Sequence, residues 1–90
     1  MRSVEWDETK RRANLEKHGV DFGEVPFMDW DNATILPDMR FDYPDPRFWA
    51  LGLLGGRLHL AAYCERGGAI RIISFRKANA KEVRRYGKKT

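Results

Sequence analysis

The sequence predicts an α+β fold in which N-terminal helices pack on a four- to five-stranded, largely antiparallel sheet that a C-terminal helix follows. Three long strand-like segments in the second half are separated by Gly55-Gly56 and Gly67-Gly68. Such pairs are typical of tight hairpin turns. Near the N-terminus, Asp7 can cap a helix and Gly19 can end it. Ninety residues suffice for one small core, so we expect residues 1–90 to form a single domain.

The N-terminal segment predicts a short strand followed by two helical segments. Residues 4–6 read as the strand, and the helix after Asp7 continues to residue 17 or 18. A second, shorter helical segment should end near residue 29 or 30. Pro26 limits its length, because proline is tolerated in a first turn but breaks a longer helix.

The rest of the chain predicts strands, one loop and a final helix. Residues 33–36 read as a short strand, and residues 37–46 contain three prolines and three aspartates, which indicates a loop. Three longer strands should follow, at residues 48–54, 57–66 and 69–77. Asn79 and Glu82 have the spacing of a capping box, so a helix should begin there and continue to about residue 86.

Two-residue hairpin loops would fix the register of the three long strands. This register pairs Leu51 with Leu60 and Leu60 with Phe75, on one apolar face. It also pairs Leu53 with Leu58, Trp49 with Ala62, and Ala62 with Ile73. We expect this face to pack against the N-terminal helices.

The opposite face of the predicted sheet has small residues at its centre and functional groups around them. Its members are Phe48, Ala50, Gly52, His59, Ala61, Tyr63, Ile72, Ser74 and Arg76. Two interpretations remain open: another helix packs closely on the small residues, or the face is a shallow platform for a ligand.

Charge is strongly polarised along the chain. Residues 46–90 contain eleven Lys and Arg against two acidic residues, a balance of +9, whereas residues 1–45 contain six against eleven, a balance of −5. Clustered cations favour a polyanion such as nucleic acid, because binding releases counterions. An ordinary solvated basic surface is an equally good interpretation.

Several classes of site and location are disfavoured by the sequence. The lone Cys64 excludes an intramolecular disulfide and a cysteine-based zinc site, and its apolar strand predicts a buried thiol. His18 and His59 lack metal-ligand spacing, so we expect no metal and no cofactor. The chain has neither a run of apolar residues that spans a membrane nor a signal peptide, and we expect a cytoplasmic protein.

A mechanism without a metal must use Arg, Lys, His, Tyr and Glu side chains. Arg76 ends a predicted strand, opposite His59 and near Tyr63, and its planar guanidinium matches phosphate. On the first helix, Lys10, Asn14, Lys17 and His18 form a polar stripe. His18 could also serve only to bond the last carbonyls of its helix.

Three groups of residues resemble the BrnT family of toxins, in the same order and over nearly the whole chain. The first is Trp6-Asp7-Glu8 with Lys10, Asn14 and residues 17–22; the second is Arg47 with Leu51-Gly52 and Gly56-Arg57; the third is residues 72–78 with Glu82 and Tyr86. The resemblance implies a RelE-like ribonuclease fold and the toxin of a type II toxin–antitoxin system, which inhibits translation and growth by cutting RNA. It also implies a BrnA-type antitoxin that neutralises the toxin. Their complex, expected to be a heterotetramer, would bind operator DNA through the antitoxin.

Two sets of residues are therefore candidates for a metal-independent endoribonuclease. In catalysis, we expect Arg76 to bind the phosphate and four residues to be candidates for moving protons: Lys17, His18, Tyr63 and Glu82. We expect five residues to contact RNA: Trp6, Arg47, Arg66, Lys77 and Tyr86. The alternative is a non-catalytic module that binds only an antitoxin or nucleic acid.

Overall fold

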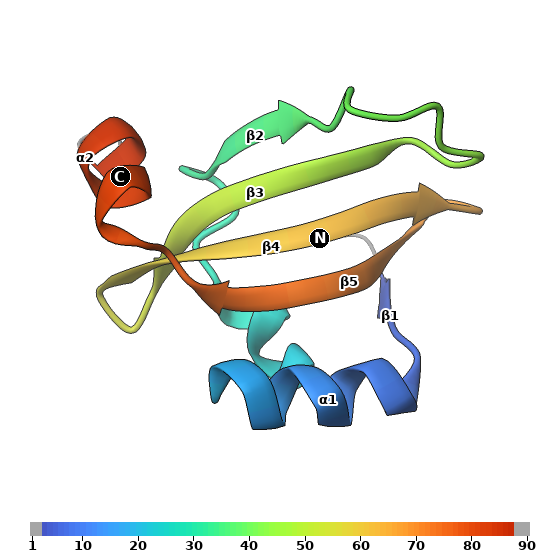
Figure 1. The fold of residues 1–90 in the computed structure, drawn as a ribbon, viewed down its shortest axis with the longest axis horizontal. Helices are drawn as coiled ribbons and strands as arrows, with labels where there is room; N and C mark the ends of the chain where they lie inside the picture. The colour runs from blue at the N-terminus through green and yellow to red at the C-terminus, as the bar shows by residue number, and fades with distance from the viewer. Residues whose placement is uncertain (1–2, 88–90) are drawn as a thin grey trace.

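The computed structural model describes residues 3–87, which form a five-stranded sheet with helices on both faces (Figure 1). The elements are β1 (Val4–Glu5), α1 (Glu8–His18), the 3₁₀ helix η1 (Phe22–Phe27), β2 (Thr34–Pro37), β3 (Arg47–Leu54), β4 (Arg57–Arg66), β5 (Ala69–Lys77) and α2 (Ala80–Tyr86). The strand order is β1-β5-β4-β3-β2. Strand β1 is parallel to β5, and the other neighbours are antiparallel. The predicted α+β fold is confirmed.

The helix boundaries follow the signals that the sequence predicted. The Asp7 side chain accepts a hydrogen bond from the Thr9 N–H at the start of α1. Gly19 ends that helix with φ of 72°, and its N–H donates to the Leu15 carbonyl. At α2 the capping box between Asn79 and Glu82 is present. The second helical segment is a short 3₁₀ helix that ends at residue 27, earlier than expected.

Both hairpins turn on glycine pairs in the left-handed region. The φ angles are 58° and 78° at Gly55 and Gly56, and 57° and 82° at Gly67 and Gly68. Positive φ at both central residues is the geometry of a type I′ turn. The first hairpin therefore has the predicted register, in which Leu51 pairs with Leu60.

The predicted register of the second hairpin is wrong beyond Ile72, because β5 contains a bulge. Tyr63 pairs with Ile72, but Ala62 pairs with Ser74, so Ile73 is the extra residue. An extra residue reverses the alternation of side chains beyond it. The predicted pairs Ala62–Ile73 and Leu60–Phe75 are replaced by Ala62–Ser74, Ala61–Phe75 and Leu60–Arg76.

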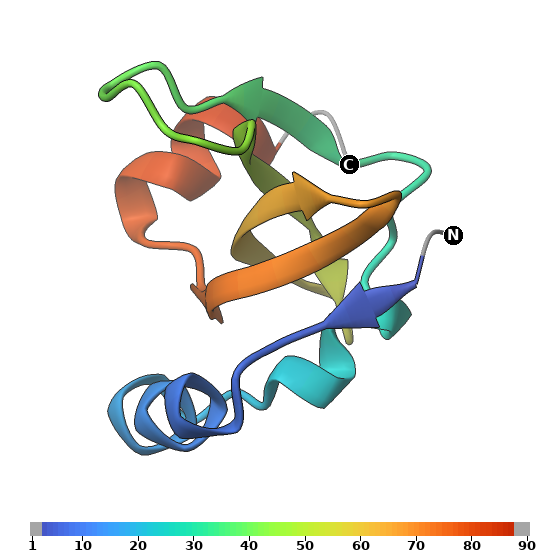
Figure 2. The same cartoon turned by 90° about the vertical axis from the view of Figure 1, so that its right-hand side faces the viewer.

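The N-terminal helices cover the small-residue face of the sheet, not the Leu51 and Leu60 face as expected. Their core cluster comprises Val20, Phe22, Val25, Met28, Ala50, Ala61, Tyr63, Ile70, Ile72 and Phe75. A side chain at Gly52 would meet the Asp29 carbonyl at 3.0 Å. Of the two interpretations of the small residues, close packing is therefore the correct one. Figure 2 shows α1 and η1 on one side of the sheet and α2 on the other.

Helix α1 is fixed to the outer edge of β5 by one buried amide. The Asn14 Oδ1 accepts from the Phe75 N–H at 3.1 Å, and its Nδ2 donates to the Phe75 carbonyl at 2.7 Å. The same Nδ2 also donates to the Val20 carbonyl at 3.2 Å. These bonds satisfy backbone groups at a sheet edge that the two-residue β1 does not reach. Within residues 3–87, no helix is long and apolar enough to cross a membrane.

Candidate functional site

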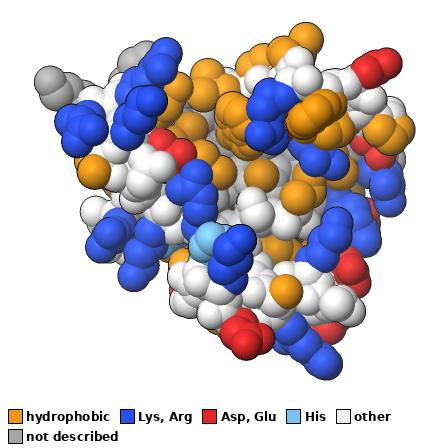
Figure 3. Space-filling view, in the orientation of Figure 1, with side chains coloured by type: hydrophobic (Ala, Val, Ile, Leu, Met, Phe, Trp, Pro, Cys, Tyr) orange, Lys and Arg blue, Asp and Glu red, His pale blue; other side chains and the backbone are white. Residues whose placement is uncertain are grey.

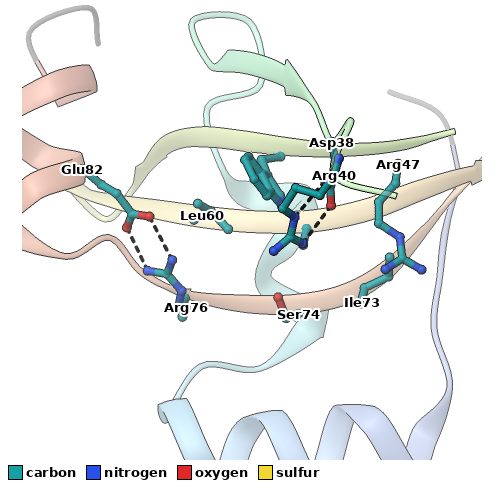
Figure 4. A pocket seen from close by; sticks show the side chains of 10 residues that line it. Asp38, Arg40, Arg47, Leu60, Ile73, Ser74, Arg76 and Glu82 are labelled. Atoms are coloured by element: carbon teal, nitrogen blue, oxygen red, sulfur yellow. Dashed lines mark hydrogen bonds and ion pairs between the residues drawn. The ribbon is translucent and has the colours of Figure 1, made fainter. Parts of the chain in front are cut away.

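The sheet face that α1 does not cover contains a hollow of about 340 Å³. Figure 4 shows Arg76 and Glu82 at one end of it, Arg40 and Arg47 toward the other, and Leu60 between them. The hollow is lined by Asp38, Arg40, Arg47, Trp49, Leu60, Ala62, Ile73, Ser74, Arg76 and Glu82. The bulge in β5 turns Ser74 and Arg76 toward this face, so a backbone irregularity builds the site.

One end of the hollow is formed by a bidentate ion pair, a fork in which a guanidinium donates two hydrogen bonds to one carboxylate. Arg76 Nη1 donates to Glu82 Oε1 at 2.8 Å, and Nη2 donates to Oε2 at 2.9 Å. These hydrogen bonds hold the pKa of Glu82 below its ordinary value and raise the pKa of Arg76. Both groups are therefore charged at neutral pH.

The other end contains a second fork that the sequence pattern did not predict. The carboxylate of Asp38 is fully buried and accepts from Arg40 Nε and Nη2, both at 2.9 Å. Tyr43 donates its hydroxyl to the same carboxylate at 3.1 Å. Hydrogen bonds from Arg40 are the main cause that lowers the pKa of Asp38 to about 2. The Arg40 guanidinium also lies over the Trp49 ring, 5.0 Å from its centroid.

Arg47 lies beside this second fork. Its guanidinium stacks on the Tyr43 ring at 4.0 Å from the centroid. Its Nε is buried and has no hydrogen-bond partner among residues 3–87. An unpaired buried donor is costly, so this part of the hollow suits a ligand that brings acceptors.

A second hollow adjoins the first at Ile73 and Ser74. It is lined by Lys10, Ala13, Asn14, Lys17, His18, Ile73 and Ser74, which confirms the polar stripe predicted on the first helix. Burial is the largest of the causes that lower the pKa of His18, and Lys17 and Arg76 add to it. The imidazole is therefore neutral at neutral pH and can accept a proton.

The structure brings several predicted site residues to the hollows. Arg76 and Glu82 are in contact, Arg47 lies at the far end, and Lys17 and His18 line the adjoining hollow. Tyr86 lines an apolar groove that contains Trp49, Leu60 and Glu82.

Other predicted site residues lie elsewhere. Tyr63 is only 3% exposed and stacks on Phe48 in the core under the helices, so its predicted place near Arg76 is wrong. The reason is that the bulge turns Arg76 to the opposite face of the sheet, while Tyr63 stays on the face that the helices cover. Trp6 packs edge-on against Phe22 in that same core.

The remaining two residues that were predicted to contact RNA, Arg66 and Lys77, lie at the ends of strands. Arg66 is exposed near the hairpin tip and pairs with Asp45 at 3.2 Å. Lys77 is exposed at the end of β5 and pairs across the sheet with His59, the residue that we expected opposite Arg76. His59 is buried, and its ring lies 5.4 Å from that of Phe75.

Asp38 and Arg40 were missed, although the sequence contains a weak signal for them. An aspartate in a loop can accept from the backbone N–H two residues later, and the Arg40 N–H does donate to Asp38 Oδ1 at 3.2 Å. An arginine two residues after such an aspartate can also bond its side chain to the same carboxylate, which would fix the orientation of the guanidinium. Nothing in the sequence pattern showed that the loop folds over Trp49.

The electrostatic character of this face is positive. Figure 3 shows Lys and Arg side chains spread over it, with apolar surface between them. No group of three or more His, Cys, Asp or Glu side chains with the geometry of a metal site occurs in the described part of the chain. The charged groups that line the first hollow are the guanidinium groups of Arg40, Arg47 and Arg76 and the carboxylates of Asp38 and Glu82, so guanidinium groups are in excess.

Comparison with known proteins identifies the family of this chain. A family model described as the ribonuclease toxin BrnT of type II toxin–antitoxin systems matches residues 6–82. A crystal structure of the Brucella abortus ribonuclease toxin BrnT at 1.1 Å resolution is similar, with a TM-score of 0.71 and 30% sequence identity. The similarity covers 88% of this chain and 99% of that one. No curated protein gives a significant match. The chain belongs to the BrnT family, as its motifs predicted.

Proposed function

We propose that this chain is a metal-independent endoribonuclease and that the hollow around Arg76 binds the phosphate that is cleaved. The observation that carries the proposal is the Arg76–Glu82 fork, which presents a fixed guanidinium at the edge of a basic hollow. In the reaction, the ribose 2′-oxygen attacks the adjacent phosphorus and the bond to the 5′-oxygen breaks. The products are a 2′,3′-cyclic phosphate and a 5′-hydroxyl.

Arg76 stabilises the negative charge that develops on the phosphate. A guanidinium presents paired donors that match two phosphate oxygens, and a preorganised donor stabilises the transition state without a further reorganisation cost. Glu82 orients this guanidinium. Since the two Glu82 bonds engage Nη1 and Nη2, a phosphate must use the other N–H groups or replace the carboxylate.

His18 is the better base for the 2′-hydroxyl. A general base works best with a pKa near the working pH, and the hydrogen bonds from Arg76 lower the pKa of Glu82, whereas burial lowers the pKa of His18 and leaves a neutral imidazole. Both pKa values are lowered here, but the ordinary pKa of an imidazole is closer to neutral pH than that of a carboxyl group. Lys17, which lines the same hollow, donates the proton to the leaving 5′-oxygen.

The family also supports proposals about partners and cell biology. We propose a BrnA-type antitoxin that neutralises this toxin, in a heterotetramer that binds operator DNA through the antitoxin. The toxin acts in the cytoplasm as one RelE-like domain and inhibits translation and growth. Co-purification from cells that express both genes tests this, and recovery of only free toxin contradicts it.

The activity itself is tested with purified toxin and end-labelled RNA in an excess of chelator. The proposal expects defined cleavage products with cyclic phosphate ends. Cleavage that appears only after a divalent cation is added would contradict the metal-independent mechanism. RNA binding without any cleavage, with or without a cation, would favour the non-catalytic module.

A further inference from the structure

Arg40 combines an exposed position with a fixed orientation. Its side chain is 59% exposed, yet the guanidinium is held by two hydrogen bonds that it donates to a fully buried carboxylate and by the Trp49 ring beneath it. An arginine has five N–H donors, and Asp38 uses two of them in this fork. A guanidinium with donors to spare is therefore already ordered before any ligand binds.

This arrangement orders the Arg40 side chain as well as the loop. The bonds from Arg40 stabilise the charged form of Asp38, so they contribute to the folded loop. The base of the loop is already closed by the backbone bond from the Asp38 N–H to the Arg47 carbonyl, at 2.8 Å. An ordered side chain does help binding, because the entropy of fixing it is not lost when the ligand arrives.

The position of Arg40 relative to Arg76 indicates the ligand. The two guanidinium groups line the same hollow toward opposite ends, with Leu60 between them (Figure 4). The unpaired Nε of Arg47 is at the Arg40 end. A strand of RNA presents phosphates at regular intervals with a ribose and base between them. Two fixed cations separated by an apolar floor match that alternation.

We infer that Arg40, held by Asp38 and Trp49, binds the phosphate of the nucleotide next to the one that is cleaved. This inference rests on the proposed function and extends it from one phosphate to a nucleotide step. Arg47 adds a second cation to the same phosphate. The residues that orient Arg40 then determine how RNA lies across the hollow.

The test measures binding of a short fluorescent RNA with 2′-fluoro groups, which lacks the attacking hydroxyl and cannot be cleaved by the proposed route. Affinity is measured across a range of salt concentrations for the wild type and for Arg40→Gln. Each phosphate contact to a single strand contributes about 0.7 to the slope of log K against log salt. Arg40→Gln should weaken binding several-fold and reduce this slope by about 0.7.

Two further variants separate charge from loop structure. Arg40→Lys keeps the charge and should keep the slope, with intermediate affinity, because lysine cannot reproduce the planar fork. Arg12→Gln is the matched control: Arg12 is exposed on α1 and lines neither hollow, so affinity and slope should not change. A weaker affinity of Arg40→Gln with an unchanged slope would mean that Arg40 only shapes the loop, and would overturn the inference.

The outcomes also distinguish this inference from the proposed activity. A wild type that binds the probe with the Arg40-dependent slope but does not cleave natural RNA contradicts the activity and leaves the phosphate site in place. Loss of antitoxin binding in Arg40→Gln, with RNA affinity and slope unchanged, would assign Arg40 to the protein partner and overturn the inference.

Discussion

Arg76 donates two parallel hydrogen bonds to Glu82, from Nη1 to Oε1 at 2.8 Å and from Nη2 to Oε2 at 2.9 Å. The same Oε1 accepts the Asn79 N–H at 2.9 Å, which is the bond that starts α2. One carboxylate therefore fixes both the fork of Arg76 and the first turn of a helix that has no fully buried residue. The orientation of the cation at the proposed cleavage site depends on this short helix.

Glu82→Gln should lower RNA cleavage about tenfold while the fold remains stable. Glutamine can also accept the Asn79 N–H in a capping box, so α2 should persist. The neutral amide bonds Arg76 less strongly than a carboxylate does, because charge-assisted hydrogen bonds are roughly twice as strong as neutral ones. The measurements are single-turnover cleavage and a melting curve. Loss of the acidic limb of the pH–rate profile in this variant would show that Glu82, not His18, is the base.

The rate of cleavage should fall with decreasing pH as His18 becomes protonated. The imidazole has its pKa lowered by burial and by the nearby cations, so this limb should lie below pH 6.5. Below that point the group is protonated and can no longer accept the hydroxyl proton. His18→Gln should be slow and lack the limb.

RNA affinity should increase as pH falls, whereas the rate of cleavage should decrease. A protonated His18 adds a cation next to Lys17, so the non-cleavable RNA should bind the wild type more tightly at low pH. A rate that stays constant across this range, in an enzyme that remains folded, would contradict the role of His18.

Asn14→Ala should destabilise the protein by at least about 2 kcal/mol. The change removes the partners of the Phe75 N–H and carbonyl at a buried sheet edge, and each unsatisfied group costs about 1–3 kcal/mol. Urea denaturation measures the loss. Glu16→Ala, at an exposed position of the same helix, is the control and should stay within about 0.5 kcal/mol of the wild type. Equal stability of the two variants would show that this edge is satisfied in another way.

Asp38 should make stability depend on pH in acid. Its pKa in the folded protein is about 2, against about 3.8 for an ordinary aspartate, so the unfolded chain binds its proton first as pH falls. The contribution of the carboxylate is complete at neutral pH, decreases below about pH 4 and is lost below about pH 2. The difference in unfolding free energy between wild type and Asp38→Asn should narrow over that range. A difference that does not change from neutral pH to pH 2.5, in urea titrations, would contradict the buried fork.

The boundaries of most elements could be predicted because their signals are local. Asp7, Gly19 and the Asn79–Glu82 box act within one helical turn, and each glycine pair determines its own hairpin. Where several residues of a strand are buried on both faces, local patterns carry less information. In β4 every residue from 58 to 64 is buried, so alternation of apolar and polar residues could not show which face meets the helices.

The bulge at Ile73 explains the largest error in the predicted site. The segment around it contains neither glycine nor proline, and both possible registers place apolar side chains on both faces. Consequently Tyr63 was expected beside Arg76, whereas the structure places it in the core. Arg76 remains in the site because two errors offset each other: the bulge moved it to the other face, and the helices cover the face where it was expected. The position of Arg40 depends on how the proline-rich loop folds, which no periodic pattern describes.

The central claim is that the Arg76 guanidinium stabilises the phosphate during RNA cleavage, and single-turnover cleavage by Arg76→Ala tests it most directly. Losing one such contact typically costs about 3–4 kcal/mol, so the rate should fall by roughly two to three decades and growth inhibition should be lost. Arg76→Lys should recover only part of the rate, because a point charge cannot reproduce paired contacts. Melting curves and antitoxin binding should remain close to those of the wild type. Cleavage by Arg76→Ala at a rate near that of the wild type would contradict the account.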